Sequence, residues 1–503
     1  MLADLILHSS PALAVSIGVA LVLTLAFARI QQNRKIKALG GRAKVLPTKS
    51  LGINNVLTTV KYAKADRNRE LWDERIAEYG THTMEMEVLT KRIIMSTDPE
   101  NIKAVLATQF HDYGKGENFH ESWFEFLGDS IFTTDGKQWQ ESRALIRTQF
   151  MKDRIADLHT FERHLQHMFS RLPMDGSPIN ISDWVFRFTL DTGTDFILGE
   201  TVNSIANAKV EFSRAFADVQ AHMNLVTRVG PFRHVLSKRK FHKDLKILNA
   251  FVEPFVERTL AMSVEDLKGK KENEYNFLHA LAQYTRDPRM LRDQLVAVLI
   301  AARDTTAGTL AWCFYELSKK PQIVKKIRAE VLNKLGPDGI PTYSDLKEMK
   351  YVMNVINETL RLYPAVPFNI RVALKDTTLP RGNANNENEP VGMPAGTAFA
   401  YSPLVMQRRA DIFGEDVLEF SPERWEGRAP KSWQYIPFNG GPRICVGQQF
   451  ALTQMQYFLA RMFQRYETVE NAMGPDHRQF EKCEITITPG NDVKVFMKPA
   501  KYN

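Results

Sequence analysis

The chain has 503 residues, of which 44% are hydrophobic and 25% are charged, a composition typical of a large folded protein. Its net charge is +8, but seven positive charges lie between Arg29 and Lys49 without one acidic residue, so the rest of the chain is almost neutral. This charge distribution excludes the extended basic surface of a nucleic-acid-binding protein, and three cysteines are too few for a disulfide scaffold and favour a reducing compartment.

The N-terminal part carries an uncharged apolar run from Pro11 to Ala28. With Ile30 and the upstream Leu5-Ile6-Leu7, the run is long enough to cross a bilayer with modest tilt. A cleaved signal peptide would carry its basic residues before the apolar run, but the first Lys or Arg here is Arg29. Basic residues after the run orient that side toward the cytosol. We predict a signal anchor over residues 1–30, with about 11–30 spanning, and a basic linker over 31–50.

Residues 51–503 contain no linker rich in Pro, Gly or Ser, which predicts a single large domain. Long helical patterns dominate it, and the short strand-like pieces include Arg92–Met95 and Ile485–Thr488. The turn-forming cluster Pro380–Asn386 predicts an exposed insertion between strands. The expected fold class is therefore mainly α with small β-sheets.

Two polar pairs stand at helical spacing. Trp139 and Arg143 are four residues apart, and Glu358 and Arg361 are three apart, so each pair shares one helix face. An exposed ion pair of this kind contributes little stability. Considered alone, Glu358 and Arg361 could be such a surface pair, and Arg143 alone would more often be a surface residue.

A long helix is predicted from Asp287, which can cap it, to about Lys320. Pro288 suits the first helical position and Pro321 stops the pattern. The middle, Ala301–Gly308, reads A-A-R-D-T-T-A-G. Adjacent threonines can bond to the preceding turn, and an Asp in an apolar helix is costly unless it is used. Taken alone, the stretch could equally be an ordinary helix with a solvent-facing Asp-Thr pair.

The most informative segment is Phe438–Gly447, F-N-G-G-P-R-I-C-V-G, which an amphipathic helical pattern follows. A helix start presents unpaired N–H groups and partial positive charge, and both favour a thiolate at Cys445. Gly440, Gly441 and Gly447 would let a flat ligand lie close to the backbone. A lone cysteine in a glycine turn is usually structural, but its neighbours here indicate a ligand.

This segment resembles the haem-binding loop of the cytochrome P450 superfamily, F-x-x-G-x-R-x-C-x-G, with every defined position filled. The resemblance implies a cytochrome P450 fold over residues 51–503 that binds haem b. It implies that Cys445 is the axial thiolate ligand of the haem iron, which favours O–O cleavage. Phe438, Arg443 and Gly447 would complete the cofactor-binding loop.

The resemblance extends to the long helix, whose centre is similar to the family's oxygen-binding motif A/G-G-x-D/E-T-T. It implies that Thr305 hydrogen-bonds oxygen at the haem and that Asp304 relays protons to it, as a general acid in a dry site. Ala302 stands where the family usually has glycine. Its methyl group would narrow the groove where oxygen binds.

Further motifs imply cofactor and structural contacts. Haem propionates need cationic or N–H donors, and the implied partners are Trp139, Arg143, Arg371 and Arg443. The family's E-x-x-R and P-E-R-F/W motifs imply a buried structural network of Glu358, Arg361 and Arg424. Such a network would lock the core under the haem loop without taking part in the chemistry.

Three runs resemble the fungal alkane and fatty-acid hydroxylases, namely residues 120–129, 368–373 and 377–382. They imply a membrane-bound haem-thiolate monooxygenase that inserts one atom of O₂ into a lipophilic substrate, an alkyl chain or fatty acid. The alternative is tailoring oxidation of a fungal polyketide or terpenoid by the same chemistry. The segments implied to line the pocket are residues 113–135, Val298–Thr305, Ala365–Asn369 and Ile485–Thr488.

The segment after Cys445 is too short for a flavin or nicotinamide domain. The resemblance therefore implies electrons from NADPH through a separate NADPH–cytochrome P450 reductase, with cytochrome b5 as an optional second donor. It implies a single-pass protein of the endoplasmic reticulum membrane, with the body in the cytosol. Two other classes stay open: a hydroperoxide-rearranging haem-thiolate enzyme, which Asp304 and Thr305 disfavour, and a non-catalytic haem protein.

Overall fold

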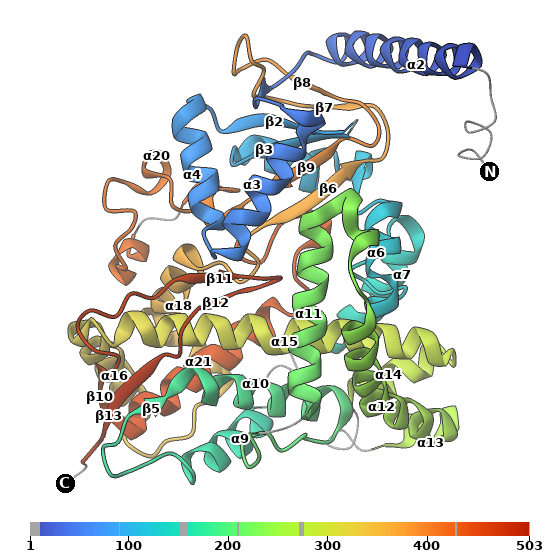
Figure 1. The fold of residues 1–503 in the computed structure, drawn as a ribbon. Helices are drawn as coiled ribbons and strands as arrows, with labels where there is room; N and C mark the ends of the chain where they lie inside the picture. Colours follow the sequence, from blue (N-terminus) through green and yellow to red (C-terminus); the bar gives the residue numbers. More distant parts are fainter. Residues whose placement is uncertain are drawn as a thin grey trace. The chain divides into compact units, whose positions relative to one another are not determined.

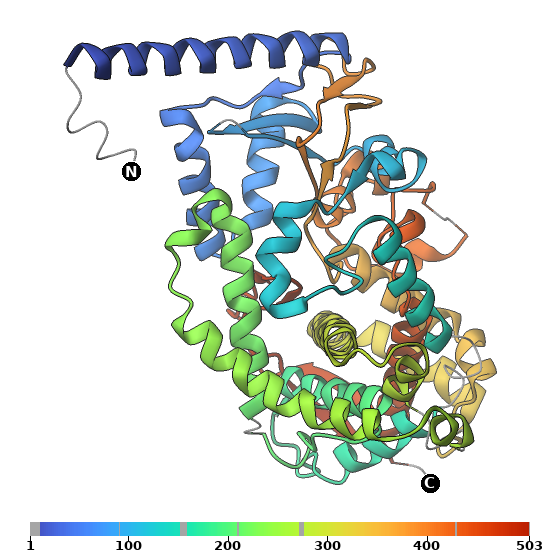
Figure 2. The same cartoon turned by 90° about the vertical axis from the view of Figure 1, so that its right-hand side faces the viewer.

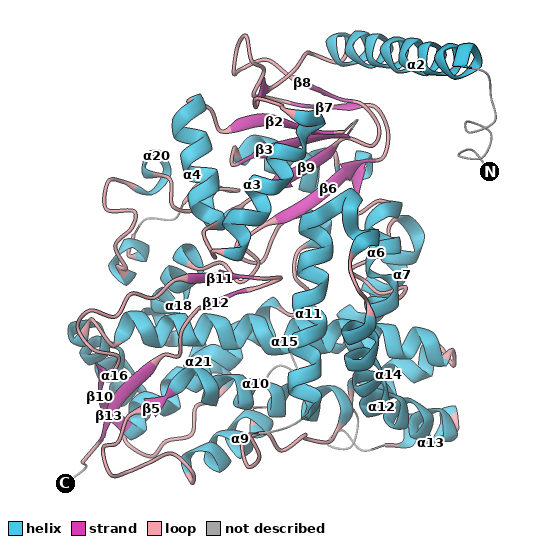
Figure 3. Ribbon diagram, in the orientation of Figure 1, coloured by secondary structure: helices cyan, strands magenta, loops and turns pink. Residues whose placement is uncertain are grey.

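The computed structural model describes residues 11–89, 91–150, 158–208, 211–270, 276–427 and 430–501 (Figure 1). They form two compact units whose segments alternate along the chain. The first unit comprises the chain up to Asn55, Ile76–Gly114 and Ile370–Ala400; the second comprises Val56–Arg75, Lys115–Asn369 and the chain from Tyr401. Figure 3 shows that helices dominate and that the strands are short, so the expected fold class is confirmed. The predicted single domain over residues 51–503 stays a prediction.

The first unit is built on a six-stranded sheet with the strand order β1-β2-β3-β9-β6-β4, and β7 pairs with β8 in a separate hairpin. Its elements are α2 (Pro11–Ala38), β1 (Lys44–Val45), β2 (Thr83–Val88), β3 (Lys91–Ser96), α5 (Pro99–Lys103), β4 (Tyr113–Gly114), β6 (Asn369–Ala373), β7 (Thr377–Leu379), β8 (Val391–Met393) and β9 (Ala398–Tyr401). Strands β2 and β3 are antiparallel, with Met84 opposite Met95. The predicted strand Arg92–Met95 therefore lies within β3.

Helix α2 extends past the predicted spanning segment, from Pro11 to Ala38. Residues 31–38 are mostly good helix formers, and the helix ends before Gly40 and Gly41, which adopt positive φ angles of 125° and 116°. The first part of the predicted linker is therefore helical. Residues 1–10, which include Leu5-Ile6-Leu7, lie outside the described residues.

The C-terminal end of α2 is bound to the sheet of its own unit. Arg29 pairs with Glu87 at 2.8 Å, and Lys35 pairs with Asp376 at 2.7 Å. Arg42, just beyond the helix, also bonds Glu87 at 2.8 Å. Three of the basic residues after the apolar run thus neutralise carboxylates of the folded unit, so this part of the linker is held in place.

Two described helices, α2 and α15, are long and apolar enough to span a membrane. The candidate span in α2, Val15–Ala38, has a mean hydropathy of 1.5 and none of its most apolar window is buried. In α15, by contrast, 78% of that window is buried inside the second unit. Helix α2 is therefore the candidate membrane helix, and α15 is a core helix.

The second unit is mainly helical. Helices α3 (Ile53–Lys64) and α4 (Asn68–Tyr79) contain residues of both units. The other helices of the second unit are α6 (Glu117–Leu127), α7 (Gly136–Arg147), α9 (His159–Phe169), α10 (Ile181–Leu198), α11 (Glu211–Val229), α12 (Arg239–Ala261), α13 (Val264–Gly269), α14 (Phe277–Tyr284), α15 (Pro288–Leu317), α16 (Pro321–Leu335), α17 (Tyr343–Glu348), α18 (Lys350–Leu362), α19 (Pro403–Met406), α20 (Ala410–Phe413) and α21 (Gln448–Arg465). Its strands are β5 (Ile179–Asn180), β10 (Tyr466–Asn471), β11 (Glu481–Cys483), β12 (Ile487–Pro489) and β13 (Lys494–Pro499).

Helix α15 runs through the middle of this unit and is seen along its axis in Figure 2. It contacts α10, α12, α18 and α21, which explains why its apolar residues are not confined to one face. As predicted, Asp287 caps it, accepting hydrogen bonds from the amides of Arg289 (2.9 Å) and Met290 (3.4 Å). The helix ends at Leu317, slightly before the predicted Lys320.

Two predicted loop and strand positions differ from the structure. Strand β12 begins at Ile487, because residues 484–486 form the turn of the β11–β12 hairpin. The cluster Pro380–Asn386 does lie between β7 and β8, but it is not wholly exposed. Asn383 is buried, since its side-chain amide donates to the carbonyls of Gly40 (2.6 Å) and Pro390 (3.1 Å).

Candidate functional site

The Cys445 loop is a tight turn that leads into α21. The amide of Cys445 donates to the carbonyl of Phe438 at 3.0 Å, and Gly447 is the residue before the first turn of α21. Asn439 adopts a φ of 65°, and the Tyr401 hydroxyl donates to its side chain at 2.9 Å. The apolar face of α21 is buried, so the loop is anchored on a rigid helix.

One glycine of this loop, Gly440, is required by packing within the protein. A β-carbon at Gly440 would lie 2.5 Å from the ring of Trp433, so glycine is needed there to let the indole cover the backbone. A β-carbon at Gly447 would lie 3.6 Å from the ring of Phe150, an ordinary contact distance. Trp433 thus occupies the side of Gly440 that a side chain would take, and the approach of a flat ligand to the loop stays a prediction.

The Cys445 side chain is accessible to solvent, although protein atoms surround most of it. This burial raises the pKa of the thiol, while the Gly447 amide and the Arg143 guanidinium lower it and do not outweigh the desolvation. The Gly447 amide at the helix start does favour the thiolate, as expected, but desolvation opposes this effect and is the larger of the two. A bound metal cation reverses this balance, since metal-ligating thiols are deprotonated.

Three of the predicted cofactor-binding residues gather beside the loop. Arg143 donates from Nη1 to the carbonyl of Ile444 at 2.8 Å. Arg443 lies over the ring of Trp139, 4.5 Å from its centroid, and forms an ion pair with Asp135 at the start of α7. Helix α7 and the Cys445 loop are thus joined by hydrogen bonds and a cation–π contact, and the Arg143 guanidinium lies close enough to the sulfur to lower the pKa of the thiol.

Arg371 lies in the first unit, on strand β6. It is only 4% exposed, and its Nη1 donates to the carbonyl of Ile370 at 2.8 Å. Its contact with a haem propionate stays a prediction, as do the propionate contacts of Trp139, Arg143 and Arg443.

The donor set around Cys445 fits a haem. The other two cysteines, Cys313 and Cys483, are buried. Among the described residues, no group of three or more His, Cys, Asp or Glu side chains could hold a metal ion. A metal at Cys445 would need its remaining ligands from a non-protein group, which a porphyrin supplies, and nearby guanidinium groups match its carboxylates.

The centre of α15 carries the predicted acid–alcohol pair. The Thr305 hydroxyl donates to the carbonyl of Ala301 at 2.7 Å, as back-bonding predicts. Asp304 is only 6% exposed, so the alternative of a solvent-facing pair is wrong. Its carboxylate accepts a hydrogen bond from Gln220 at 2.7 Å and lies 3.4 Å from Arg303. Gln220 was missed because no local pattern marks it.

The methyl group of Ala302 packs against α10. The position that a β-carbon would take at Gly193 lies 3.6 Å from it, so the glycine on α10 leaves room for this alanine. Ala302 and Val446, the neighbour of Cys445, pack against the same hydrophobic cluster, which includes Leu299 and Ile300. The acid–alcohol segment and the cysteine loop therefore share one part of the core.

The structure brings Glu358, Arg361 and Arg424 together. Arg361 binds Glu358 with two hydrogen bonds of 2.8 Å, and both side chains are fully buried. Arg424 lies 3.4 Å from the same carboxylate. The Ser421 amide and the Nε1 of Trp425 also donate to Glu358, each at 3.0 Å, and the sequence pattern revealed neither contact.

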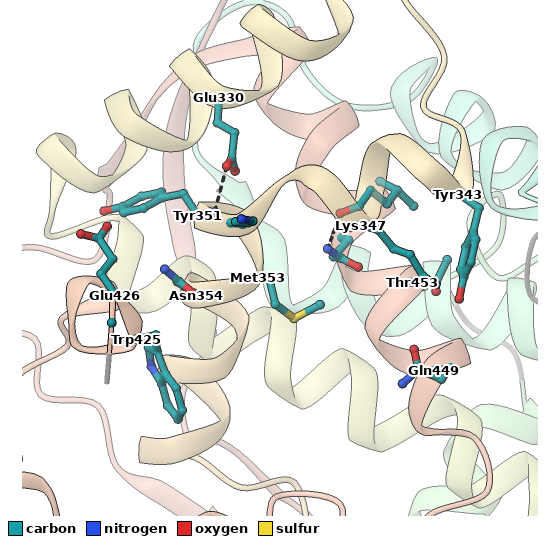
Figure 4. A pocket seen from close by; sticks show the side chains of 14 residues that line it. Glu330, Tyr343, Lys347, Tyr351, Met353, Asn354, Trp425, Glu426, Gln449 and Thr453 are labelled. Atoms are coloured by element: carbon teal, nitrogen blue, oxygen red, sulfur yellow. Dashed lines mark hydrogen bonds between the residues drawn. The ribbon is translucent and has the colours of Figure 1, made fainter. Parts of the chain in front are cut away.

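Two cavities of about 580 Å³ each lie on the second unit, away from the acid–alcohol pair. Figure 4 shows the first, between α16, α17, α18 and α21, where Glu330 accepts from the amides of Tyr351 and Val352 and so caps α18. The second adjoins it at Trp425 and reaches Ile444, beside Cys445. Neither is lined by Asp304, Thr305 or Cys445.

An accessible cysteine at a helix mouth, arginines on and beside its loop, and a buried aspartate next to a half-buried threonine on a core helix match the arrangement expected of a haem-thiolate protein. A family model described as Cytochrome P450 matches residues 49–494, and the chain therefore belongs to the cytochrome P450 family. It is a cytochrome P450 monooxygenase, and the family's cofactor is a haem held through a cysteine thiolate.

Several similar proteins are fungal. The cytochrome P450 monooxygenase pvhE of Talaromyces variabilis is 43% identical over 97% of this chain and 96% of its own length. Cytochrome P450 52A13 of Debaryomyces hansenii is 39% identical over 77% of this chain and 78% of its own. Cytochrome P450 52A1 of Candida tropicalis is 38% identical over 85% of this chain and 83% of its own.

Proposed function

We propose that this cytochrome P450 binds haem b through Cys445 and hydroxylates an alkyl chain or fatty acid. The observation that carries the proposal is the position of the run 120–129, which resembles the fungal alkane and fatty-acid hydroxylases. Its Trp123 and Phe126 pack in the same apolar cluster as Val298 and Leu299 of α15. An apolar wall next to the acid–alcohol segment suits a hydrocarbon chain.

The run is fixed against α15 at its C-terminal end. The amide of Asp129 donates to Asp293 on α15 at 2.9 Å. Gly128, at a φ of 50°, comes so close that a β-carbon there would overlap the Asp293 carboxyl group. The turn therefore requires glycine, and it places α6 against α15 with little freedom.

In the proposed mechanism the haem, when bound, supplies the oxygen chemistry, and the protein controls protons and access. The Thr305 hydroxyl donates to Ala301, so its oxygen lone pairs can accept a hydrogen bond from a protonated group in the site. Asp304 is the group that would take a proton from solvent and pass it on. The apolar cluster around Val298 excludes bulk water.

Replacing Thr305 with alanine is expected to leave NADPH consumption running while peroxide replaces most of the hydroxylated product. The reason is that the site loses the hydroxyl that directs protons. Product, peroxide and NADPH are measured in the same reaction. Thr309→Ala is the matched control, because Thr309 makes the same back-bond, to Thr305 at 2.8 Å, one turn further on. Unchanged coupling in Thr305→Ala would contradict the assigned role.

The electrons in this proposal come from NADPH through a separate NADPH–cytochrome P450 reductase, with cytochrome b5 as an optional second donor. Ile444 is 37% exposed next to Cys445 and borders the second cavity, so a protein donor can approach the sulfur from that side. The exposed apolar surface of α2 supports a single-pass anchor in the endoplasmic reticulum membrane.

A spectral binding screen tests the substrate class. Fatty acids and alkanes are expected to shift the haem from low spin to high spin, because they displace water from an apolar site. Polyketides and terpenoids of similar mass are the comparison set. If only the polycyclic compounds caused the change of spin state, the result would contradict hydrocarbon hydroxylation and support tailoring oxidation. Turnover without NADPH or reductase would instead support a hydroperoxide-rearranging enzyme.

A further inference from the structure

The carboxylate of Asp304 is held from outside its own helix. Gln220, on α11, donates from Nε2 to Oδ2 of Asp304 at 2.7 Å. Both side chains are about nineteen-twentieths buried, at 5% and 6% exposure. A buried hydrogen bond to a charged group is among the stronger side-chain contacts, so this bond fixes the direction of the carboxylate.

The contact belongs to a stripe along one face of α11. Ser213, Phe216 and Gln220 follow one another at helical spacing and all meet the segment Arg303-Asp304 of α15. Arg303 donates to the Ser213 hydroxyl at 2.8 Å and lies 5.8 Å from the centroid of the Phe216 ring. Figure 1 shows α11 crossing α15 in this region. Residues of α11 therefore contact Asp304 and the neighbouring Arg303 directly.

A carboxylate held by an amide is poorly placed to deliver protons. The Gln220 N–H cannot itself give up a proton near neutral pH, so this contact offers the carboxylate no proton source. While Oδ2 is engaged, the carboxylate points toward α11. The other oxygen, Oδ1, lies 3.4 Å from Arg303, so both oxygens face polar partners, and turning the carboxylate toward Thr305 would break the bond to Gln220.

We propose that Gln220 is a positioning residue that keeps Asp304 turned toward α11 and so suppresses proton delivery until the bond is broken. The inference rests on the proposed role of Asp304 and adds a residue that controls it. The bond between Gln220 and Asp304 would limit the wasteful reduction of oxygen to peroxide in the resting enzyme. That side reaction converts O₂ to H₂O₂ with two protons and two electrons. The electrons come from NADPH through the reductase.

The test uses the full-length holoenzyme with its reductase and no substrate. Gln220→Leu is expected to raise NADPH oxidation and peroxide release on the order of tenfold, the change that loss of one charge-assisted hydrogen bond produces. Gln220→Met keeps the length of the side chain but removes the donor, and it is expected to act in the same direction. If neither variant raises peroxide release, the proposal is overturned.

Ser213→Ala is the matched control, because it removes the other hydrogen bond between α11 and this segment and leaves Gln220 in place. Amide hydrogen exchange over residues 211–229 measures how much each variant loosens α11. We expect Ser213→Ala and Gln220→Leu to loosen α11 comparably and only Gln220→Leu to release peroxide faster. An equal rise in both would assign the effect to helix packing and refute positioning by Gln220.

The Asp304→Asn variant distinguishes the proposed role of Asp304 in proton delivery from the proposed positioning role of Gln220. In the Gln220→Leu background it is expected to abolish the extra peroxide release, because no acid is left to be freed. If Asp304→Asn alone changes neither coupling nor the solvent isotope effect, the proposed role of Asp304 fails. If it changes them while the Gln220 variants match wild type, only the positioning role of Gln220 fails.

Discussion

Replacing Cys445 with alanine is expected to abolish the strongly red-shifted carbon monoxide spectrum of the reduced protein. That spectrum requires a thiolate on the iron, and the described structure offers no substitute. Cys313 and Cys483 are both about 2% exposed or less, and burial raises the pKa of Cys313 to about 12. The pKa of Cys483 is likewise raised by burial. The measurement is the reduced carbon monoxide difference spectrum.

Cys483→Ala is the control for this experiment, because it removes a thiol of the same unit that no part of the proposed site uses. It is expected to keep the spectrum. Far-ultraviolet circular dichroism shows whether Cys445→Ala is folded, and Cys445→Ser gives a second variant of nearly the same size. Survival of the red-shifted spectrum in either folded Cys445 variant would disprove the ligand assignment.

Replacing Arg361 with alanine is expected to destabilise the folded protein by about 3–5 kcal/mol, the cost of leaving one member of a buried ion pair without its partner. Arg361 and Glu358 are both fully buried. Arg361 also donates to the carbonyls of Gln407 at 3.1 Å and Val417 at 2.7 Å, which would lose a donor. Urea unfolding followed by circular dichroism, with haem content measured in parallel, gives the size of the effect.

Lys334→Ala is the matched control for Arg361→Ala. Lys334 pairs with Glu348 at 2.5 Å, but the two side chains are 33% and 59% exposed, so the expected loss of stability is small compared with that of a buried pair. If Arg361→Ala unfolded at the same urea concentration as Lys334→Ala, the buried network would not be the structural lock that we assign to it.

The parts of the site that the sequence predicted are those with a local signal. Asp287 and Pro288 mark the start of α15 because capping depends on adjacent residues. The loop around Cys445 is recognisable because the motif lies within ten residues. Glu358 and Arg361 are one helical turn apart, so their shared face follows from periodicity, although their complete burial depends on the surrounding core.

The contacts that the sequence could not predict join distant segments. Gln220 and Asp304 are 84 residues apart, and Arg443 and Asp135 are 308 apart. Neither pair lies in a pattern that periodicity or turn chemistry can detect. The state of the Cys445 thiol was also beyond local reasoning, because the helix start favours a thiolate while the enclosing protein opposes it and outweighs it.

The way α2 joins the first unit decides where the chain can be shortened for work in solution. A chain that starts at residue 29 would lack the apolar run but keep Arg29, Lys35 and Arg42 on their acidic partners. A chain that starts at residue 50 would lose strand β1 and both cations that neutralise Glu87. The candidate membrane helix also carries residues that bind the sheet of the first unit, so the practical boundary between the two lies inside α2.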